Sequence, residues 1–215
     1  MSNYMAIICL IAPPLLLCKK NLHIPIICCN FALHTSFYMI YLREIHTADA
    51  DYAFVEALWL QAFPEIERRD TAAQRQNTDT NPLFHCLLAT SPEGEPIGFL
   101  TYWDFGSYCY GEHFATDMRL RNRGYGGQII RAAIDHIARP LVLEVELPQD
   151  DLSRRRIGFY RRNGLSLWQD IPYVQPAYRV GGKALPMHLM ATPDLEPSRC
   201  ADQVIRTIHR YVYGV

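Results

Sequence analysis

The stretch RLRNRGYGGQIIRAAIDHI, from Arg119 to Ile137, decides the fold, because three glycines fall within four positions directly ahead of a helical pattern. Glycine inside a regular element costs roughly 0.5–1 kcal/mol relative to alanine, since it loses more backbone freedom on folding. Gly124, Gly126 and Gly127 therefore need a role that offsets this cost. The helix that follows has an apolar face at helical spacing, made of Ile129, Ile130, Ala133, Ile134 and Ile137.

A predicted strand, residues 110–116, leads into this glycine loop. A helix N-terminus presents backbone N–H groups that have no partner within the helix, at the positive end of the helix dipole. Such an arrangement binds anions, phosphate above all, and glycine lets a phosphate approach the backbone closely. The alternative is a tight strand-to-helix turn without a ligand. Two other phosphate-binding patterns, GxxxxGK[ST] and GxGxxG, are absent.

Hydrophobic periodicity in the rest of the chain predicts alternating strands and helices, which form one α/β domain without internal repeats. Thr47 and Asp49 are the candidate caps of the first helix, and Pro64 ends it. Residues 77–82 are expected to form a turn, and residues 169–185 a long connection. The predicted strands are 40–45, 83–90, 96–105, 110–116, 141–147, 165–168 and 186–191, and the predicted helices are 47–63, 65–76, 125–137, 150–164 and 197–215.

The composition is that of an ordinary globular protein, since 49% of the 215 residues are hydrophobic and 20% are charged. A net charge of −1 gives no overall excess of positive charge for nucleic-acid binding. The seven cysteines show no CxxC pair with metal-ligand spacing, and four of them fall in the first 38 residues. We therefore expect a reduced, cytoplasmic protein without a disulfide framework or a metal.

The first 38 residues differ from the rest in being apolar and rich in cysteine. The apolar run from Met5 to Leu17 is shorter than the ~20 residues needed to span a bilayer, and Pro13 and Pro14 interrupt it. We expect this leader to lie outside the fold, with Met39 as the true start. A membrane-associating leader is the alternative. The expected division of the chain is residues 1–38 as leader, 39–195 as the domain and 196–215 as a C-terminal amphipathic helix, whose apolar face packs on the domain or on a second subunit of a homodimer.

Two motifs carry a resemblance to a known family. Residues 121–126, RNRGYG, match the [Q/R]-x-x-G-x-[G/A] pyrophosphate loop of the GNAT superfamily of N-acetyltransferases. Residues 158–165, GFYRRNGL, look like the second signature of that family, and the order of the predicted elements is similar from about residue 39 to 192. The resemblance implies an α/β fold with a mixed, mostly antiparallel central sheet, a splayed strand pair, and helices on both faces.

The resemblance also implies acetyl-CoA as co-substrate, without a metal. Backbone N–H groups of the glycine loop would hold the pyrophosphate, and the backbone of residues 114–116 would pair with the pantetheine arm as an added strand. Ordinary sheet pairing is the alternative for residues 114 and 116. Relatives commonly carry an asparagine where this chain has Ser153, which is a departure from the family pattern. The expected cofactor-binding residues are Phe114, Ala115, Thr116, Arg121, Asn122, Arg123, Gly124, Tyr125, Gly126, Gly127 and Ser153.

Three residues are candidates for the chemistry. Tyr160 falls where the family often has a tyrosine that protonates the departing thiolate, although it also fits a core aromatic residue. An amine attacks only when neutral, so a base is required, and Glu144 and Glu146 point to one face of a strand. Glu144 stands where several relatives place an acidic residue; a salt bridge to a nearby arginine is the alternative. Glu112 and His113 are lesser candidates.

The acceptor site is expected at two loops, 63–70 and 169–186. Glu65 or Glu67 would hold a cation, and Tyr173 and Tyr178 would cover the acceptor, although each is also typical of an exposed loop. The chain is therefore interpreted as an acetyl-CoA-dependent N-acetyltransferase acting on a small-molecule or peptide amine by direct transfer. The alternative is an inactive acetyl-CoA-binding sensor. The arginines of the second signature helix fit either the 3′-phosphate of CoA or a solvated face: Arg154, Arg155, Arg156, Arg161 and Arg162.

Overall fold

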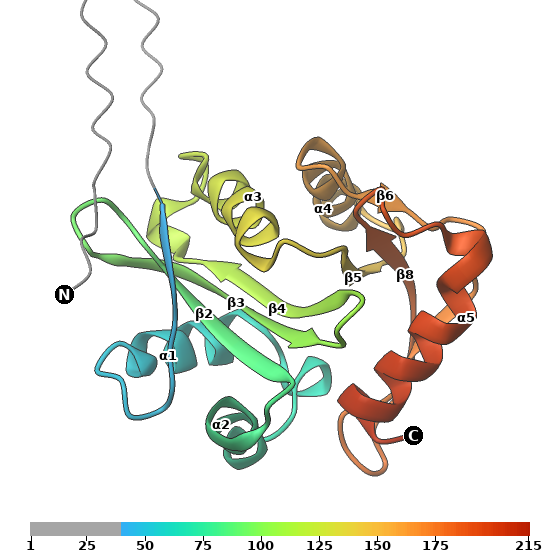
Figure 1. The fold of residues 1–215 in the computed structure, drawn as a ribbon, viewed down its shortest axis with the longest axis horizontal. Coiled ribbons are helices and arrows are strands. Elements are labelled where there is room, and N and C mark those ends of the chain that lie inside the picture. The colour runs from blue at the N-terminus through green and yellow to red at the C-terminus, as the bar shows by residue number, and fades with distance from the viewer. Residues whose placement is uncertain (1–39) are drawn as a thin grey trace, which may run out of the picture. The chain divides into compact units, whose positions relative to one another are not determined.

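A computed structural model describes residues 40–215, so the predicted leader lies outside the described part of the chain. Figure 1 shows a central sheet with helices on both of its faces. The strands are β1 (Tyr41–Glu44), β2 (Phe84–Thr90), β3 (Pro96–Asp104), β4 (Cys109–Thr116), β5 (Leu141–Glu146), β6 (Ser166–Leu167), β7 (Tyr173–Gln175) and β8 (Leu185–Ala191). The helices are α1 (Tyr52–Ala62), α2 (Thr71–Thr80), α3 (Tyr125–Ile137), α4 (Asp151–Arg162) and α5 (Pro197–Ile208), with short turns η1 (Glu65–Glu67), η2 (Met118–Leu120) and η3 (His209–Tyr213).

The strand order is β1-β2-β3-β4-β5-β8-β6, and β7 pairs with β8. Every neighbouring pair is antiparallel except β4 and β5, which run parallel. Helices α1 and α2 lie on one face of the sheet, and α3 and α4 lie on the other (Figure 1). The predicted mixed, mostly antiparallel α/β fold is therefore confirmed.

The parallel pair of strands separates toward its C-terminal end. Residues Cys109–Gly111 of β4 pair with Leu141–Leu143 of β5, and beyond this stretch β4 pairs with β3 while β5 pairs with β8. A register shift opposite Thr101 and Tyr102 leaves Glu112 without a partner on β3, which is a β-bulge. Bulges are common beside active sites because they redirect a side chain. The predicted splayed pair is thus present, with Glu112 at the point where it opens.

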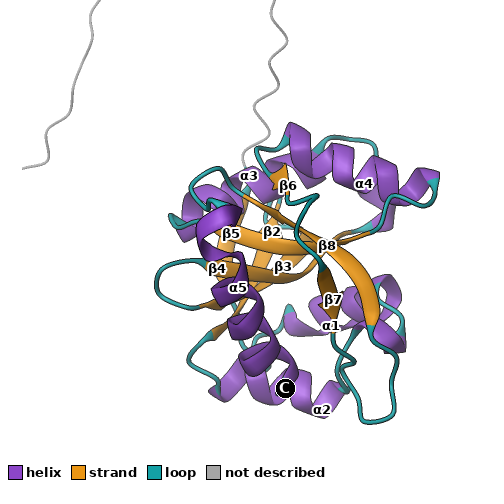
Figure 2. Ribbon diagram, turned by 90° about the vertical axis from the view of Figure 1, so that its right-hand side faces the viewer, coloured by secondary structure: helices purple, strands orange, loops and turns teal. Residues whose placement is uncertain are grey.

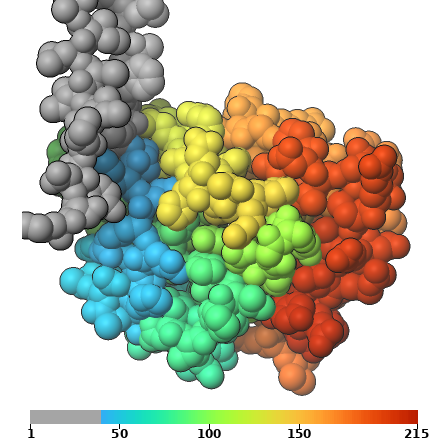
Figure 3. All heavy atoms as spheres, in the orientation of Figure 1, coloured from blue at the N-terminus to red at the C-terminus, as the bar shows by residue number. Residues whose placement is uncertain are grey.

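The sheet is covered by the apolar faces that the sequence predicts for its helices. Helix α1 buries Tyr52, Val55, Leu58 and Trp59, and α3 buries Ile129, Ile130, Ala133 and Ile137. Helix α5 lies across the sheet (Figure 2), where its Val204 and Ile208 share a hydrophobic cluster with Val142 of β5 and Leu189 of β8. In the space-filling view the C-terminal residues form one flank of the described unit (Figure 3). The C-terminal helix therefore packs on the sheet.

Three local predictions differ from the structure. Asp51 is the N-cap of α1, while Thr47 bonds to Asp79 and Asp49 accepts from the amide of His46. The polar helix predicted for residues 65–76 is instead η1 followed by α2, because the Asp70 side chain caps a new helix that continues to Thr80. The long connection after residue 168 contains β7, which the sequence pattern did not indicate.

The helix predicted for residues 197–215 is not regular to its end, because α5 ends at Ile208 and the turn η3 follows. The π-helical turn η3 changes the helical phase, so Tyr211 is exposed while Val212 is buried. None of the helices in residues 40–215 has the length and hydropathy needed to cross a bilayer.

Candidate active site

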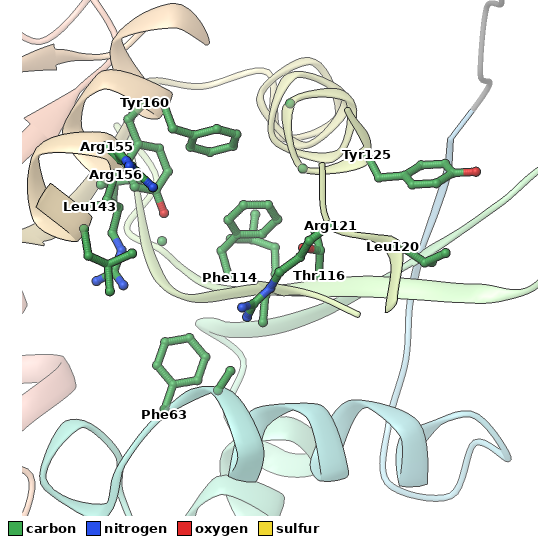
Figure 4. A pocket seen from close by; sticks show the side chains of 18 of the residues that line it. Phe63, Phe114, Thr116, Leu120, Arg121, Tyr125, Leu143, Arg155, Arg156 and Tyr160 are labelled. Atoms are coloured by element: carbon green, nitrogen blue, oxygen red, sulfur yellow. The ribbon is translucent and has the colours of Figure 1, made fainter. Parts of the chain in front are cut away.

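A cavity of about 710 Å³ opens where β4 and β5 separate. Its walls come from the end of α1, the exposed edge of β4, the glycine loop, the start of α3, β5 and α4. Figure 4 shows Tyr160 reaching in from α4, Phe63 facing it from the end of α1, and Arg121 entering from the loop. Parts of the chain that are distant in sequence, from the end of α1 to α4, therefore share one cavity. Of the predicted site residues, Phe114, Ala115, Thr116, Arg121, Asn122, Gly124, Tyr125, Gly126, Gly127, Glu67, Glu112, Glu144, Arg155, Arg156 and Tyr160 line it.

The glycine loop leaves its backbone N–H groups available. Asn122 and Gly124 have φ angles of 63° and 81°, in the left-handed region that favours glycine, and Gly124 is the N-cap of α3. Five loop amides donate to no acceptor within residues 40–215, namely those of Asn122, Arg123, Gly124, Gly126 and Gly127. Unpaired N–H groups at a helix N-terminus suit a phosphate. The loop can therefore bind an anion through its main chain.

The other two glycines, Gly126 and Gly127, differ in what surrounds them. A Cβ at Gly126 would stand 3.5 Å from Phe159 Cε2 and 3.7 Å from Thr116 Cγ2, so the position faces the cavity with room for one small group. A Cβ at Gly127 would stand 3.1 Å from Asn163 Oδ1, which is tight, so this glycine allows α3 to approach the end of α4. The three glycines thus serve a left-handed turn, an open cavity wall and a close helix contact.

Glu112 is fully buried at the opening of the strands and is paired with a cation. The Arg69 guanidinium, whose side chain is 8% exposed, donates to both carboxylate oxygens. Trp103 Nε1 and the Tyr178 hydroxyl also donate to it, at 3.0 and 2.9 Å. Burial is the largest single influence and acts to raise the pKa of Glu112. The charges of Arg69 and His113 and the hydrogen bonds from Arg69 and Trp103 together outweigh burial and leave the pKa below its ordinary value. Glu112 is therefore an ionised structural carboxylate.

Glu144 lies across the same opening and has hydroxyl and amide partners instead of a cation. The hydroxyls of Tyr173 and Tyr213 donate to its carboxylate, and Gln175 Nε2 donates at 2.8 Å. No arginine, lysine or histidine of residues 40–215 forms an ion pair with it. Burial raises the pKa of Glu144 to about 7, although these hydrogen bonds act to lower it. A carboxylate with this pKa can accept a proton near neutral pH.

Tyr160 is buried on α4, and its side chain points into the cavity (Figure 4). Burial raises the pKa of its hydroxyl to about 12, so the hydroxyl is protonated at neutral pH. It has no hydrogen-bond partner among the described residues. A protonated hydroxyl without an internal acceptor is free to donate to a group in the cavity.

Several predicted residues do not line the cavity. Glu146 pairs with Arg156 beside it, and Ser153 completes the capping box of α4 with Asp150. Glu65 is exposed and lies 3.5 Å from Arg179. Tyr173 lies in β7 and not in a loop, and its hydroxyl, like that of Tyr178, is directed to a buried carboxylate. Arg123 is exposed, and His113 is buried with its Nε2 near the Glu67 carbonyl oxygen.

Tyr173 and Tyr178 were among the predicted site residues, but three other partners of the two glutamates were not. Arg69, Gln175 and Tyr213 come from η1–α2, β7 and the C-terminal turn. Arg69 lies in a run of charged residues that is typical of a solvated surface, and Tyr213 lies at the end of an amphipathic helix. No local pattern marks either of them as a site residue.

The model of the acetyltransferase (GNAT) family matches residues 51–165 of this chain. The chain belongs to the GNAT family of acetyltransferases. It is also 40% identical to a Bacteroides thetaiotaomicron protein named as a GNAT-family acetyltransferase, with a TM-score of 0.78 over 81% of this chain and 99% of that one. The family match covers the glycine loop, β4, β5 and α4, which are the elements that enclose the cavity.

More distant structures share the GNAT fold but act on different acceptors. A spermidine N-acetyltransferase mutant from Vibrio cholerae is 12% identical, with a TM-score of 0.54 over 71% of this chain and 92% of that one. The ribosomal-protein-S18-alanine N-acetyltransferase from Escherichia coli is 18% identical, with a TM-score of 0.52 over 72% and 94%. None of the curated proteins matches this GNAT acetyltransferase. The fold therefore leaves the acceptor open.

Proposed function

We propose that this protein transfers the acetyl group of acetyl-CoA to a primary amine by direct attack within a ternary complex. The observation that carries the proposal is one cavity lined by an anion-binding loop and by two residues suited to proton transfer. Glu144 can accept a proton near neutral pH, and Tyr160 can donate one. The family membership makes acetyl transfer the reaction class. The amine acceptor and the roles of the residues belong to the proposal.

The residues present fit acetyl-CoA as a co-substrate. The unpaired amides of the glycine loop would bind its pyrophosphate, with Arg121 adding positive charge at the same end. These amides are those of Asn122, Arg123, Gly124, Gly126 and Gly127. The edge of β4 beyond Gly111, which β5 does not cover, would pair with the pantetheine amides. Arg155 lines the cavity on α4 and suits the remaining phosphate. The thioester would then lie between the separated strands.

The reaction needs one proton acceptor and one proton donor. An ammonium group of the acceptor loses a proton to Glu144, directly or through one water. The neutral nitrogen forms a bond to the acetyl carbon, and the bond from that carbon to sulfur breaks. The Tyr160 hydroxyl gives its proton to the departing thiolate, whose conjugate thiol has a pKa near 8.5. As the carbon–sulfur bond breaks, the nitrogen loses its second proton, which returns through solvent to the Tyr160 phenolate. The products are an N-acetyl amine and CoA with a protonated thiol, and Glu144 releases the first proton to solvent.

Glu146 is a weaker candidate for the base than Glu144, because Arg156 holds it in an ion pair. Glu67 is half-buried at the acceptor side and lines the cavity with Phe63. We assign Glu67 to binding of the acceptor cation. The hydroxyls of Tyr173 and Tyr178 are engaged by Glu144 and Glu112, so we assign these tyrosines to holding the carboxylates.

The reducing cytoplasm is the proposed location of this activity. Cys86 and Cys109 are buried free thiols, and Cys200 is a partly exposed one. Free thiols persist in a reducing compartment.

The direct test is a screen of primary amines with acetyl-CoA, read as release of free thiol and as acetylated product by mass spectrometry. The panel contains amino acids, polyamines, aminoglycosides and peptides with free N-termini. Calorimetry with acetyl-CoA runs in parallel, using Gly126→Val as a control that fills the cavity wall where the backbone tolerates a side chain. We expect at least one amine to release thiol and the variant to bind acetyl-CoA at least tenfold more weakly. Binding without thiol release for any amine would instead identify an acetyl-CoA sensor.

A further inference from the structure

The C-terminal turn η3 brings one tyrosine into the buried site. The Tyr213 hydroxyl lies 3.1 and 2.9 Å from the two carboxylate oxygens of Glu144. Gln175 Nε2 donates to the same hydroxyl oxygen at 2.9 Å. Because a hydroxyl has one proton, a Tyr213 oxygen that accepts from Gln175 gives its own proton to Glu144. Tyr213 is therefore oriented as a donor to the carboxylate.

The π-helical geometry of η3 accounts for this position. Helix α5 ends at Ile208, and residues His209–Tyr213 form a turn with wider i→i+5 hydrogen bonding. In this turn Tyr211 is 46% exposed, whereas Tyr213 lies among buried hydroxyls. Single π-helical turns inside α-helices are frequent at functional sites. The turn places a polar group in the site at the position where a regular helix would continue its apolar stripe.

Tyr213 also connects the two buried carboxylates. Its hydroxyl lies 3.5 Å from the Tyr178 hydroxyl, which donates to Glu112 Oε1 at 2.9 Å. The Tyr110 hydroxyl lies 3.3 Å away from the Tyr213 hydroxyl on another side. Because each hydroxyl gives its single proton to a carboxylate, no proton lies between Tyr213 and Tyr178. Their contact still joins the surroundings of Glu144 to the Arg69–Glu112 ion pair. A change in the position of Tyr213 affects both sides of the opening.

We propose that Tyr213 is a positioning residue that holds the Glu144 carboxylate toward the acceptor, so that the C-terminal turn is a part of the active site. This inference rests on the proposed function, in which Glu144 is the base. Three of the donors to Glu144, namely Tyr173, Gln175 and Tyr213, lie beyond residue 165, where the family match ends. Tyr110 of β4 is a further hydrogen-bond partner and lies within the match. The segment matched by the family therefore supplies the carboxylate, and the chain after it supplies three of the groups that orient it.

The groups that face Glu144 determine how its pKa changes when one hydrogen-bond donor is removed. Tyr110 and Glu112 face it from β4, Tyr173 from β7, and Tyr213 from η3, with Tyr178 and the Arg69 cation one step further away. Hydrogen bonds to a carboxylate favour its ionised form, and the nearby Glu112 charge opposes ionisation. Removing the Tyr213 hydroxyl therefore makes Glu144 hold its proton to higher pH.

The test compares Tyr213→Phe with Tyr211→Phe in the full-length protein. Both changes remove one hydroxyl from the same turn, but Tyr211 is exposed and packs only against Phe105 and Arg210 in the described structure. The first measurement is a carbon-13 NMR titration of glutamate carboxyl groups, with the Glu144 signal assigned by its loss in Glu144→Gln. We expect the Glu144 midpoint to rise by about one pH unit in Tyr213→Phe and to stay unchanged in Tyr211→Phe.

The second measurement is the pH profile of turnover with the best amine of the screen. We expect the ascending limb of Tyr213→Phe to move to higher pH, with about a fivefold loss of kcat at pH 7 and an unchanged KM for acetyl-CoA. A Glu144 midpoint that does not move in the NMR titration, or that moves equally in both variants, overturns the inference. If the wild-type protein acetylates no amine, the proposed function fails, and the NMR titration still decides whether Tyr213 orients Glu144.

Discussion

Glu112 and Glu144 lie on neighbouring strands at the same opening and are both at least partly buried, yet their surroundings give them opposite properties. Glu112 lies at a bulge and receives the Arg69 guanidinium, which keeps its pKa below the ordinary value. Glu144 receives tyrosine hydroxyls and one amide, and burial raises its pKa to about 7. Burial alone therefore does not define a catalytic carboxylate.

The presence of a buried cation is what separates the two roles. An ion pair with several hydrogen bonds fixes the charge of Glu112 and makes it part of the framework. Neutral hydrogen-bond donors hold the Glu144 side chain in place and leave its pKa near neutral pH. The comparison predicts that substitutions at the two positions affect different observables.

The largest expected effect is the loss of activity in Glu144→Gln. Removal of a general base lowers turnover by about 10²–10⁴-fold. We expect this loss in kcat with the best amine, without a decrease in the unfolding temperature, because a buried carboxyl without a cation is replaced by a neutral amide. Thiol-release kinetics measure kcat, and thermal unfolding measures the unfolding temperature. Activity within threefold of wild type would remove Glu144 from the mechanism.

The next effect concerns stability in Glu112→Gln. This substitution leaves Arg69 buried without a counter-charge, which costs about 3–5 kcal/mol in the free energy of unfolding. Urea unfolding at pH 7 gives the value, and the double variant Arg69→Met with Glu112→Leu is the control that removes both charges. We expect the double variant to be more stable than Glu112→Gln. A single variant as stable as wild type would show that the ion pair is not part of the framework.

The two glutamates should also give stability curves of opposite slope with pH. The folded-state pKa of Glu144 is about 7 against an ordinary 4.5, so its contribution is present below pH 4.5 and is lost as the pH rises to 7, by roughly 3 kcal/mol. The folded-state pKa of Glu112 is lowered, so its contribution is present above pH 4.5 and is lost as the pH falls further. The free energy of unfolding is measured from pH 3.5 to 8 for wild type and both Gln variants.

In that series, Glu144→Gln should lack the decline between pH 4.5 and 7, and Glu112→Gln should lack the loss at the acid end. Equal slopes in wild type and Glu144→Gln would mean that Glu144 titrates normally.

The smallest effect is expected at a third carboxylate, Glu146, which lies on β5 with Glu144. Glu146 and Arg156 form a partly exposed pair, with side chains 37% and 40% exposed. Such pairs contribute about 0–1 kcal/mol. Glu146→Gln should therefore change the free energy of unfolding by less than about 1 kcal/mol and kcat by less than about twofold. A large loss of kcat in this variant would place the base at Glu146 and contradict the comparison.

Much of the framework was predictable from the sequence because it depends on local patterns. The glycine loop, the apolar face of α3 and the apolar runs of the central strands involve residues that are close together in the chain. The division of residues 65–80 into η1 and α2 was missed because the Asp70 cap lies inside a uniformly polar stretch.

The chemistry of the site could be predicted only in part. The sequence indicated Glu144 and Tyr160 by resemblance, but the properties of the glutamates depend on partners far along the chain. Arg69 reaches Glu112 across 43 residues, and Tyr213 reaches Glu144 across 69. No periodicity in a single sequence encodes such pairings, and they arise only when the bulge, β7 and the π-helical turn are in place.

The most direct test of the central claim is the pH dependence of kcat at saturating acetyl-CoA and amine, measured for wild type and Glu144→Gln. The profile of kcat reports groups in the complex of enzyme with its substrates. We predict that wild-type kcat rises through a midpoint near pH 7 and that this rise is absent in Glu144→Gln. A rise that persists unchanged in Glu144→Gln would contradict the assignment of Glu144 as the base.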